Sequence, residues 1–249
     1  VEDDARPPCP AQGVIGQIGW YLGDLAAPIG PNSWTSILKS CEAAVTAADA
    51  ILAGDRAAYA LCRPSGHHAR WDRGSGLCYI NNTAAAAQHL RQRHNKVAIL
   101  DIDAHHGDGT QQIFYKRDDV LTISIHADTS NYYPFFTGYA AETGYGAGEG
   151  YNLNLPLAHG AGADAMNHAI DQAIAKIRSF GADALVVALG FDAHIKDPIG
   201  VLTLQSQDFA TIGQRMRALG LPTLIVQEGG YAIEAICDCL DFFLGGLNA

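Results

Sequence analysis

Residues 97–109 read VAILDIDAHHGDG, and this stretch decides how the whole chain is interpreted. Its first four residues are apolar, which is typical of a short buried strand. The nine residues that follow hold three Asp and two His. A strand that enters a strand-to-helix turn carries its last side chains to the edge of a sheet, where open α/β folds bind their ligands. Asp and His gathered at such an edge predict a divalent metal site.

The other predicted strands are also followed by side chains that can bind metals or carry protons. In a parallel sheet the carboxyl ends of the strands share one edge, so residues that are distant in sequence converge there. Convergence of several such groups favours a hydrolytic site over isolated capping residues. The strands and the residues behind them are 58–62 with His67 and His68, 97–102 with Asp103 and His105, 120–125 with His126, 184–189 with Asp192, and 222–227 with Glu228 and Tyr231.

Segments with helical spacing of apolar residues alternate with these strands. Such alternation predicts βαβ units, in which helices cover both faces of a mainly parallel sheet. We therefore expect an α/β fold with three layers, α/β/α, in a single domain that spans residues 1–249. The expected helices are a short one within 15–25, one at about 34–53 with Ser33 as N-cap and Gly54 as its end, one from Asn81 or Asn82 to 93, and others at 163–180, 206–219 and 233–244, with an extended segment at 152–155.

The composition argues against several classes of partner. The chain of 249 residues has a formal net charge of -10, which disfavours a nucleic-acid surface and suits a small cationic substrate. No apolar run approaches the roughly 18 residues that a membrane-spanning helix needs. The six cysteines form no CxxC pair and are too sparse for a disulfide scaffold, which indicates a reducing cytoplasm.

Asp103, His105 and Asp192 are the predicted zinc ligands. A catalytic zinc takes three protein ligands and leaves a position for water and substrate. Asp103 and His105 lie two residues apart at a strand end, so their side chains can face the same side, and Asp192 follows another strand. Zinc lowers the pKa of its water toward ~7 and polarises a carbonyl. The neighbouring His106 receives no role.

Hydrolysis of an amide also needs a base, an acid for the amine and a donor for the oxyanion. His67 and His68 can serve as the base and the acid. Asp101 and Asp108 are candidates for orienting the two imidazoles. Tyr231 follows two glycines that allow its loop to approach closely, and its hydroxyl can supply the oxyanion donor. Zinc-assisted hydrolysis is therefore the leading hypothesis.

Five motifs of the chain strongly resemble the zinc-dependent histone deacetylase superfamily. Their order and approximate spacing fit that family, and the resemblance runs from about residue 13 to the end. Three further segments, 16–21, 124–128 and 132–139, look most like its branch of bacterial acetylpolyamine amidohydrolases. The five motifs are RPSGHHA at 63–69, GLCYINN at 76–82, DIDAHHGDG at 101–109, GFD at 190–192 and EGGY at 228–231.

The resemblance implies an arginase/deacetylase fold, the same three zinc ligands and more specific catalytic roles. It makes His68 the principal general base and acid, with His67 as its electrostatic partner, and it lets Tyr231 polarise the acetyl carbonyl. Gly76 and Tyr133 would line the tunnel for the acylated amine. Leu77 would line it too, at a position that is often Phe in relatives. The resemblance also suggests a structural potassium ion near Asp101, Asp103, His105, Ser124 and Ile125.

The chain departs from the family in length. Family members carry a further segment before this one, which includes the first strand of the sheet and a loop at the rim of the pocket. The N-terminal part of the family fold is therefore expected to be absent here. The chain would be either a fragment or a minimal form with a more open site, which another subunit of a homo-oligomer could complete.

The leading function is zinc-dependent hydrolysis of the acetyl amide of small acetylated amines, such as acetylpolyamines, with release of acetate. The alternative is a deacetylase of acetyl-lysine in peptides or proteins. A binuclear manganese ureohydrolase has a related fold, but it needs a second Asp two residues after Asp192, where His194 stands. A non-catalytic amine-binding homologue would have no need of both histidines, all three ligands and Tyr231 together.

Overall fold

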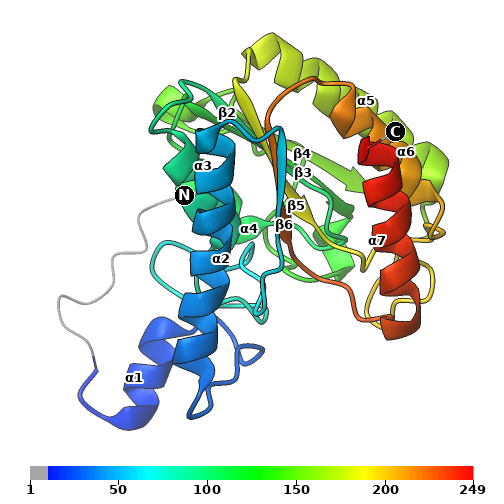
Figure 1. Ribbon diagram of the computed structural model, residues 1–249. Coiled ribbons are helices and arrows are strands. Elements are labelled where there is room, and N and C mark those ends of the chain that lie inside the picture. Colours follow the sequence, from blue (N-terminus) through cyan, green and yellow to red (C-terminus); the bar gives the residue numbers. More distant parts are fainter. Residues whose placement is uncertain (1–10, 249) are drawn as a thin grey trace.

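Six parallel strands form one sheet in the computed structural model, which describes residues 11–248 (Figure 1). The order across the sheet is β1-β6-β5-β2-β3-β4, and every neighbouring pair is parallel. The mainly parallel sheet expected from the sequence is therefore confirmed. The strands are β1 (Ala57–Ala60), β2 (Val97–Asp101), β3 (Val120–Ala127), β4 (Asn152–Leu157), β5 (Ala184–Leu189) and β6 (Thr223–Gln227).

Helices cover both faces of the sheet, which confirms the predicted three-layer architecture (Figure 1). One hydrophobic core packs α5, α6 and α7 against the sheet, and a second core packs α2, α3 and the end of α4 against the opposite face. The helices are α1 (Val14–Tyr21), α2 (Ser33–Ala53), α3 (Asn82–Leu90), α4 (Asp108–Phe114), α5 (Ala163–Phe180), α6 (Asp208–Arg217) and α7 (Ile233–Asn248), and two 3-10 turns lie at Thr129–Asn131 and Gly146–Gly148.

The central strands are buried along their whole length, as their continuous apolar sequences require. All residues of β2, β3 and β5 are buried, whereas the edge strands β1 and β4 are partly exposed. Successive side chains of a strand point to opposite faces. In β2, Ile99 therefore packs in the core beneath α2 and α3, while Leu100 packs in the core beneath α5.

Local signals explain where several helices begin and end. Gly54 ends α2 in a left-handed conformation with φ of 113°, as predicted, because a residue without Cβ adopts it most easily. Asn81 caps α3 by accepting a hydrogen bond from the backbone N of Ala84 at 2.8 Å. Ser33 is the first residue of α2 and not its cap, a position that Asn32 takes. The short helix α4 was not predicted.

The order in which the chain adds strands to the sheet reverses between β2 and β5. From β2 the chain proceeds outward through β3 and β4, whereas β5 lies on the other side of β2 and leads outward to β6. Asp101 at the end of β2 pairs with Ala188 of β5, so the loops that follow these two strands begin side by side. Ligands of open α/β sheets bind at such a switch point, outside the carboxyl ends of the strands.

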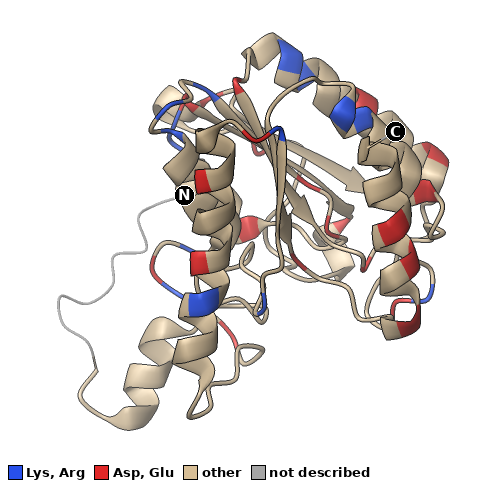
Figure 2. Ribbon diagram, in the orientation of Figure 1, with Lys and Arg blue, Asp and Glu red and all other residues tan. Residues whose placement is uncertain are grey.

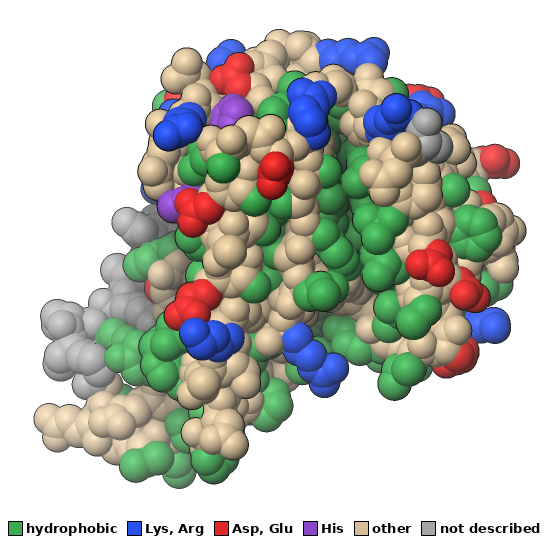
Figure 3. Space-filling model, viewed as in Figure 1, with side chains coloured by type: hydrophobic (Ala, Val, Ile, Leu, Met, Phe, Trp, Pro, Cys, Tyr) green, Lys and Arg blue, Asp and Glu red, His purple; other side chains and the backbone are tan. Residues whose placement is uncertain are grey.

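A large surface groove adjoins this region, and Ser65, Leu77 and Tyr231 line it near the ends of β1 and β6. It has a volume of about 990 Å³, and its lining includes Ile37 of α2, Leu61 beyond β1 and Ile236 of α7. Figure 3 shows the hollow between α2 and α7 with hydrophobic side chains along it.

In Figure 2 Lys and Arg gather mostly near the upper end of the view, where the strands begin. Between residues 11 and 248, none of the helices is both long and apolar enough to cross a membrane.

Candidate metal and catalytic site

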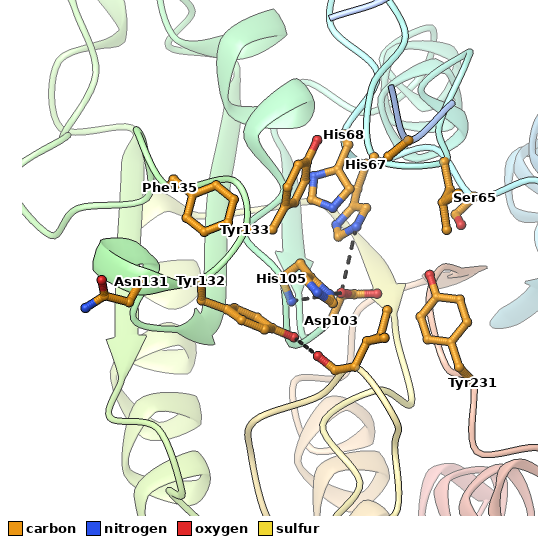
Figure 4. Close-up of a pocket in the computed structure, with 14 residues that line it drawn as sticks. Ser65, His67, His68, Asp103, His105, Asn131, Tyr132, Tyr133, Phe135 and Tyr231 are labelled. Atoms are coloured by element: carbon orange, nitrogen blue, oxygen red, sulfur yellow. Dashed lines mark hydrogen bonds and ion pairs between the residues drawn. The ribbon is translucent and has the colours of Figure 1, made fainter. Parts of the chain in front are cut away.

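A cavity of about 340 Å³ lies at the carboxyl ends of the central strands (Figure 4). Its polar floor holds His67, His68, Asp103 and His105, which come from the segment after β1 and the segment after β2. Its walls are largely aromatic, and no Lys or Arg lines it among the described residues. The cavity therefore combines metal-binding groups with an apolar passage that suits a slender organic substrate.

Asp103, His105 and Asp192 come together as the sequence predicted. One potential ligand atom from each lies within 4.8 Å of the other two, and all three residues are buried. The His105 Nδ1 atom is 2.7 Å from Asp192 Oδ2 and 3.2 Å from Asp103 Oδ1. One imidazole nitrogen and two carboxylates are the type and number of ligands that a catalytic zinc takes from a protein.

Backbone groups hold the two carboxylates in place. The Gly229 amide donates to Asp103 Oδ2 at 2.7 Å, and the Ala104 amide donates to Asp192 Oδ1 at 2.7 Å. A Cβ atom at Gly190 would fall 2.3 Å from Asp103 Oδ2, so only glycine permits this approach. The carboxylates are thus fixed in position by the fold before any ion binds.

The electrostatics of this group also fit a cation. Burial and the nearby Asp103 carboxylate raise the pKa of Asp192 to about 7. Two carboxylates confined to one buried volume repel each other, and a divalent ion relieves that repulsion. The residues present therefore fit the zinc ion that the sequence implies.

His67 is paired with Asp101 beneath the cavity. Its Nδ1 lies 2.9 Å from Asp101 Oδ2, and its Nε2 lies 3.8 Å from Asp103 Oδ1. Burial alone would lower the pKa of His67, but Asp103 and Asp101 outweigh it and place that pKa well above its ordinary value. His67 therefore favours the protonated form.

His68 is paired with Asp108, which is itself bound by Arg70. The His68 Nδ1 atom is 2.7 Å from Asp108 Oδ1, and Arg70 donates to Asp108 Oδ2 through Nε at 3.1 Å and Nη2 at 2.9 Å. Burial and the charge of His67 lower the pKa of His68 to about 4. His68 is thus neutral at pH 7, and a proton on Nδ1 leaves Nε2 able to accept another.

Tyr231 stands across the cavity from the two histidines (Figure 4). Its backbone N donates to Asp197 Oδ2 at 2.6 Å, and Asp197 also accepts from the amides of Ile199 and Gly200, which joins the loop after β6 to the loop after β5. Burial and the Asp103 carboxylate raise the pKa of Tyr231. Its hydroxyl therefore stays protonated and can donate a hydrogen bond.

The three residues predicted to bind substrate, Gly76, Leu77 and Tyr133, all line the cavity. The Tyr133 ring meets the His68 ring edge-on, with centroids 4.9 Å apart. A Cβ atom at Gly76 would lie 2.5 Å from the His68 ring, so glycine there keeps the passage open. Gly76 and Leu77 have φ of 53° and 67°, which places both in the left-handed region.

Three further residues contribute to the site in roles that the sequence did not predict. Tyr132 stacks on the His105 ring with centroids 4.6 Å apart. Glu228 accepts from the amides of Gly66 and His67 and so fixes the histidine segment. Asp24 accepts from the Tyr133 hydroxyl at 2.6 Å. Tyr132 adjoins the predicted residue Tyr133, and Glu228 begins the EGGY motif at 228–231. The contact of Asp24 spans 109 residues, so no local pattern in the sequence indicates it.

Other residues considered from the sequence lie outside the cavity lining. His126 is buried between Ser124 Oγ at 2.8 Å and the carbonyl of Gly138 at 2.9 Å. The His194 Nε2 atom is 3.2 Å from Ser206 Oγ, and His194 does not belong to the group of candidate ligands. Asp101 pairs with Ser124 in the β2–β3 ladder, so two of the groups expected near potassium are neighbours. The potassium ion itself stays a prediction.

Comparison with known proteins identifies the family. A family profile described as the histone deacetylase domain matches residues 9–247. Acetylpolyamine amidohydrolase 1 of Pseudomonas aeruginosa is 51% identical over 224 residues, which cover 90% of this chain and 65% of the relative. Acetylpolyamine amidohydrolase of Burkholderia pseudomallei is 47% identical over 244 residues, which cover 98% of this chain and 72% of the relative.

The fold agrees with these sequence matches. A crystal structure of acetylpolyamine aminohydrolase from Burkholderia pseudomallei is similar with a TM-score of 0.96 and 47% identity, covering 98% of this chain and 72% of that one. The family resemblance drawn from the five motifs is thereby confirmed. The match extends over nearly all of the sequence, and the chain belongs to the histone deacetylase domain family.

Proposed function

We propose that the protein is a zinc-dependent amidohydrolase that removes the acetyl group from small acetylated amines, acetylpolyamines above all. The observation that carries the proposal is the convergence, on one aromatic-walled cavity, of three candidate zinc ligands, the histidine pair and Tyr231. The names of the similar proteins point to the same substrate class. Asp103, His105 and Asp192 would hold the zinc ion, which when bound supplies Lewis-acid polarisation of the acyl carbonyl.

The chain's own residues would carry the proton transfers. Water adds to the acetyl carbon, the bond from that carbon to nitrogen breaks, and acetate and the free amine leave. His68, neutral and oriented by Asp108, takes a proton from the attacking water and delivers it to the leaving amine. His67 contributes positive charge beside it. The Tyr231 hydroxyl donates to the oxygen on which negative charge develops.

The cavity is suited to the linear tail of such an amine. Tyr132, Tyr133 and Phe135 present aromatic rings along it. Aromatic faces attract ammonium groups, and the chain's formal net charge of -10 attracts cations in general. A slender cationic amine therefore has favourable contacts from the reacting carbonyl to the mouth.

Metal analysis combined with acetate release tests the proposal. Zinc-loaded protein should release acetate from acetylputrescine and acetylspermidine faster than from an acetyl-lysine peptide. Preference for the peptide would instead establish the protein-deacetylase alternative. Two bound manganese ions with release of urea, or binding of amines without any turnover, would overturn the proposal. A cytoplasmic location, a homo-oligomer and the absence of a nucleic-acid partner stay predictions.

A further inference from the structure

The segment at residues 132–138, here called the aromatic loop, supplies much of the cavity wall. Tyr132, Tyr133 and Phe135 all line the cavity from this loop. Phe135 has φ of 71°, a left-handed conformation that is unfavourable for a residue with a side chain. Phe135 is also 55% exposed, so burial of its own ring does not hold it there. The shape of the loop must therefore be imposed by contacts elsewhere.

Glu142 is the centre of those contacts. A single carboxylate oxygen, Oε2, accepts hydrogen bonds from Gln111 Nε2 at 2.7 Å, Thr137 Oγ1 at 2.9 Å, the Gly138 amide at 2.9 Å and Asn154 Nδ2 at 3.2 Å. Two donors belong to the aromatic loop, one to α4 and one to β4. The carboxylate thus ties the end of the loop to two elements of the scaffold.

Among the described residues, all four groups that donate to the Glu142 carboxylate are neutral. Within residues 11–248 no Lys or Arg lies at ion-pair distance from it. Hydrogen bonds to an ionised acceptor are about twice as strong as those between neutral groups. Several donors that share one ionised oxygen therefore form a strong anchor, and the neutral carbonyl oxygen of Gln would bind the same donors more weakly.

Two buried histidines complete the anchor. A Cβ atom at Gly138 would fall 2.9 Å from both the His106 and His126 rings, so the loop backbone lies directly on them. His126 Nε2 donates to the Gly138 carbonyl at 2.9 Å, and His106 Nε2 donates to Gln111 Oε1 at 3.0 Å. His106 directly follows the candidate ligand His105, so the metal segment and the aromatic loop share one network.

We propose that Glu142 is a positioning residue that holds the aromatic loop in the shape needed to contact the tail of the acylated amine. The anchoring stands on the hydrogen bonds alone, whereas the effect on ligand binding rests on the proposed zinc amidohydrolase function. Two experiments separate these claims. Both use the variant Glu142→Gln and the control Glu149→Gln. Glu149 is an exposed carboxylate nearby, and among the described residues its hydrogen-bond donor is the Thr143 hydroxyl.

The first experiment is limited digestion with chymotrypsin, which cleaves after aromatic residues in opened chain. Loss of one charge-assisted hydrogen bond raises the population of the opened loop about tenfold or more. Cleavage after Phe135, Phe136 or Tyr139 should therefore accelerate about tenfold in Glu142→Gln and stay unchanged in Glu149→Gln. Unchanged cleavage in Glu142→Gln would overturn the anchoring, whatever the protein's activity.

The second experiment measures binding of two hydroxamates to the zinc-loaded protein by calorimetry. Acetohydroxamate reaches only the metal, whereas octanohydroxamate also places an alkyl tail along the aromatic loop. Glu142→Gln should weaken octanohydroxamate about tenfold and leave acetohydroxamate and zinc affinity unchanged. Equal weakening of both ligands would reveal a general structural defect and overturn the positioning role, as would no weakening of either.

A milder variant keeps the proposal testable if Glu142→Gln folds poorly. Thr137→Val removes one of the four donors, so it should shift cleavage and octanohydroxamate binding in the same direction by a smaller factor. No effect of Thr137→Val on either measurement would count against the anchor. Acetate release tests a separate matter: a chain that binds octanohydroxamate tightly but releases no acetate would refute the hydrolase and leave the positioning role intact.

Discussion

Replacement of Asp108 by Asn tests the proton-transfer role most directly. The Asp108 carboxylate accepts three hydrogen bonds, one from His68 and two from Arg70. Asn offers one oxygen, and the guanidinium of Arg70, which can only donate, will draw that oxygen to itself. The Asn NH₂ group then faces His68 Nδ1. The imidazole must accept there and carry its proton on Nε2, which is the wrong tautomer for a base.

The size of the effect follows from this change of tautomer. A positioned general base contributes about 10²–10⁴-fold to the rate, which corresponds to roughly 3–5 kcal/mol of barrier. We therefore expect Asp108→Asn to lower kcat by about 10²–10⁴-fold. Stability should fall as well, by about 1.5–3 kcal/mol for each charge-assisted bond that is lost. Zinc content should not change, because Asp108 is not among the candidate ligands.

Initial rates of acetate release at saturating acetylputrescine, expressed per bound zinc, provide the assay. Asp118→Asn is the control, because this carboxylate is exposed, lies outside the cavity and stands just before β3, at the opposite ends of the strands. A kcat for Asp108→Asn within about tenfold of the unmodified chain, at equal zinc content, would refute the tautomer argument.

Three further predictions concern the oxyanion donor, the metal and pH. Tyr231→Phe should lower kcat about 10²–10³-fold in the acetate assay, while zinc content and melting temperature stay unchanged. Asp192→Asn should weaken zinc more than about 100-fold in a competition titration with a chelator, since a ligand is lost. Burial lowers the pKa of His126 to about 4. As pH falls below about 6.5, this histidine is protonated in the unfolded chain while it stays neutral in the folded protein. Free energy of unfolding that is present at pH 7 is therefore lost toward pH 4, and the loss is roughly 2–3 kcal/mol at pH 4.5. Urea unfolding of the unmodified chain and His126→Gln at both pH values should show this difference.

Each of these has a contrary outcome. Full activity of Tyr231→Phe would remove the tyrosine from the mechanism. Unchanged zinc affinity in Asp192→Asn would mean that the ion binds elsewhere. An identical pH dependence of stability in His126→Gln would show that this histidine titrates normally in the folded protein.

Periodicity in the sequence was sufficient to predict the long elements. The bounds of α5 and β5 agree with the predicted ranges 163–180 and 184–189, because each has many residues with one consistent pattern of burial. Helix α4 was missed because it has only seven residues and begins amid Gly107, Asp108 and Gly109, which suggest a loop. Its formation depends on tertiary contacts, such as the Thr110 amide donating to the carbonyl of His67.

The candidate site likewise has a part that the sequence predicts and a part that it does not. Except for His126, the residues predicted at strand ends lie together, because parallel strands necessarily bring their carboxyl ends to one edge. The roles of Arg70, Asp24 and Glu142 depend on pairings between distant segments that no spacing rule describes. His106 had no assigned role because its contacts, with Gln111 and the His126 ring, serve the wall of the cavity and not the metal.

The placement of the candidate ligands beside β2 and β5 also has a kinetic consequence. Interior strands of a sheet exchange their amide hydrogens only when the molecule opens globally, whereas edge strands such as β1 and β4 open locally at lower cost. On heating, the ion should therefore be released together with global unfolding, at a single midpoint. A chelator at room temperature instead reaches the ion through the cavity mouth, so the metal-free chain should still protect the amides of Ile99 and Leu100 from exchange.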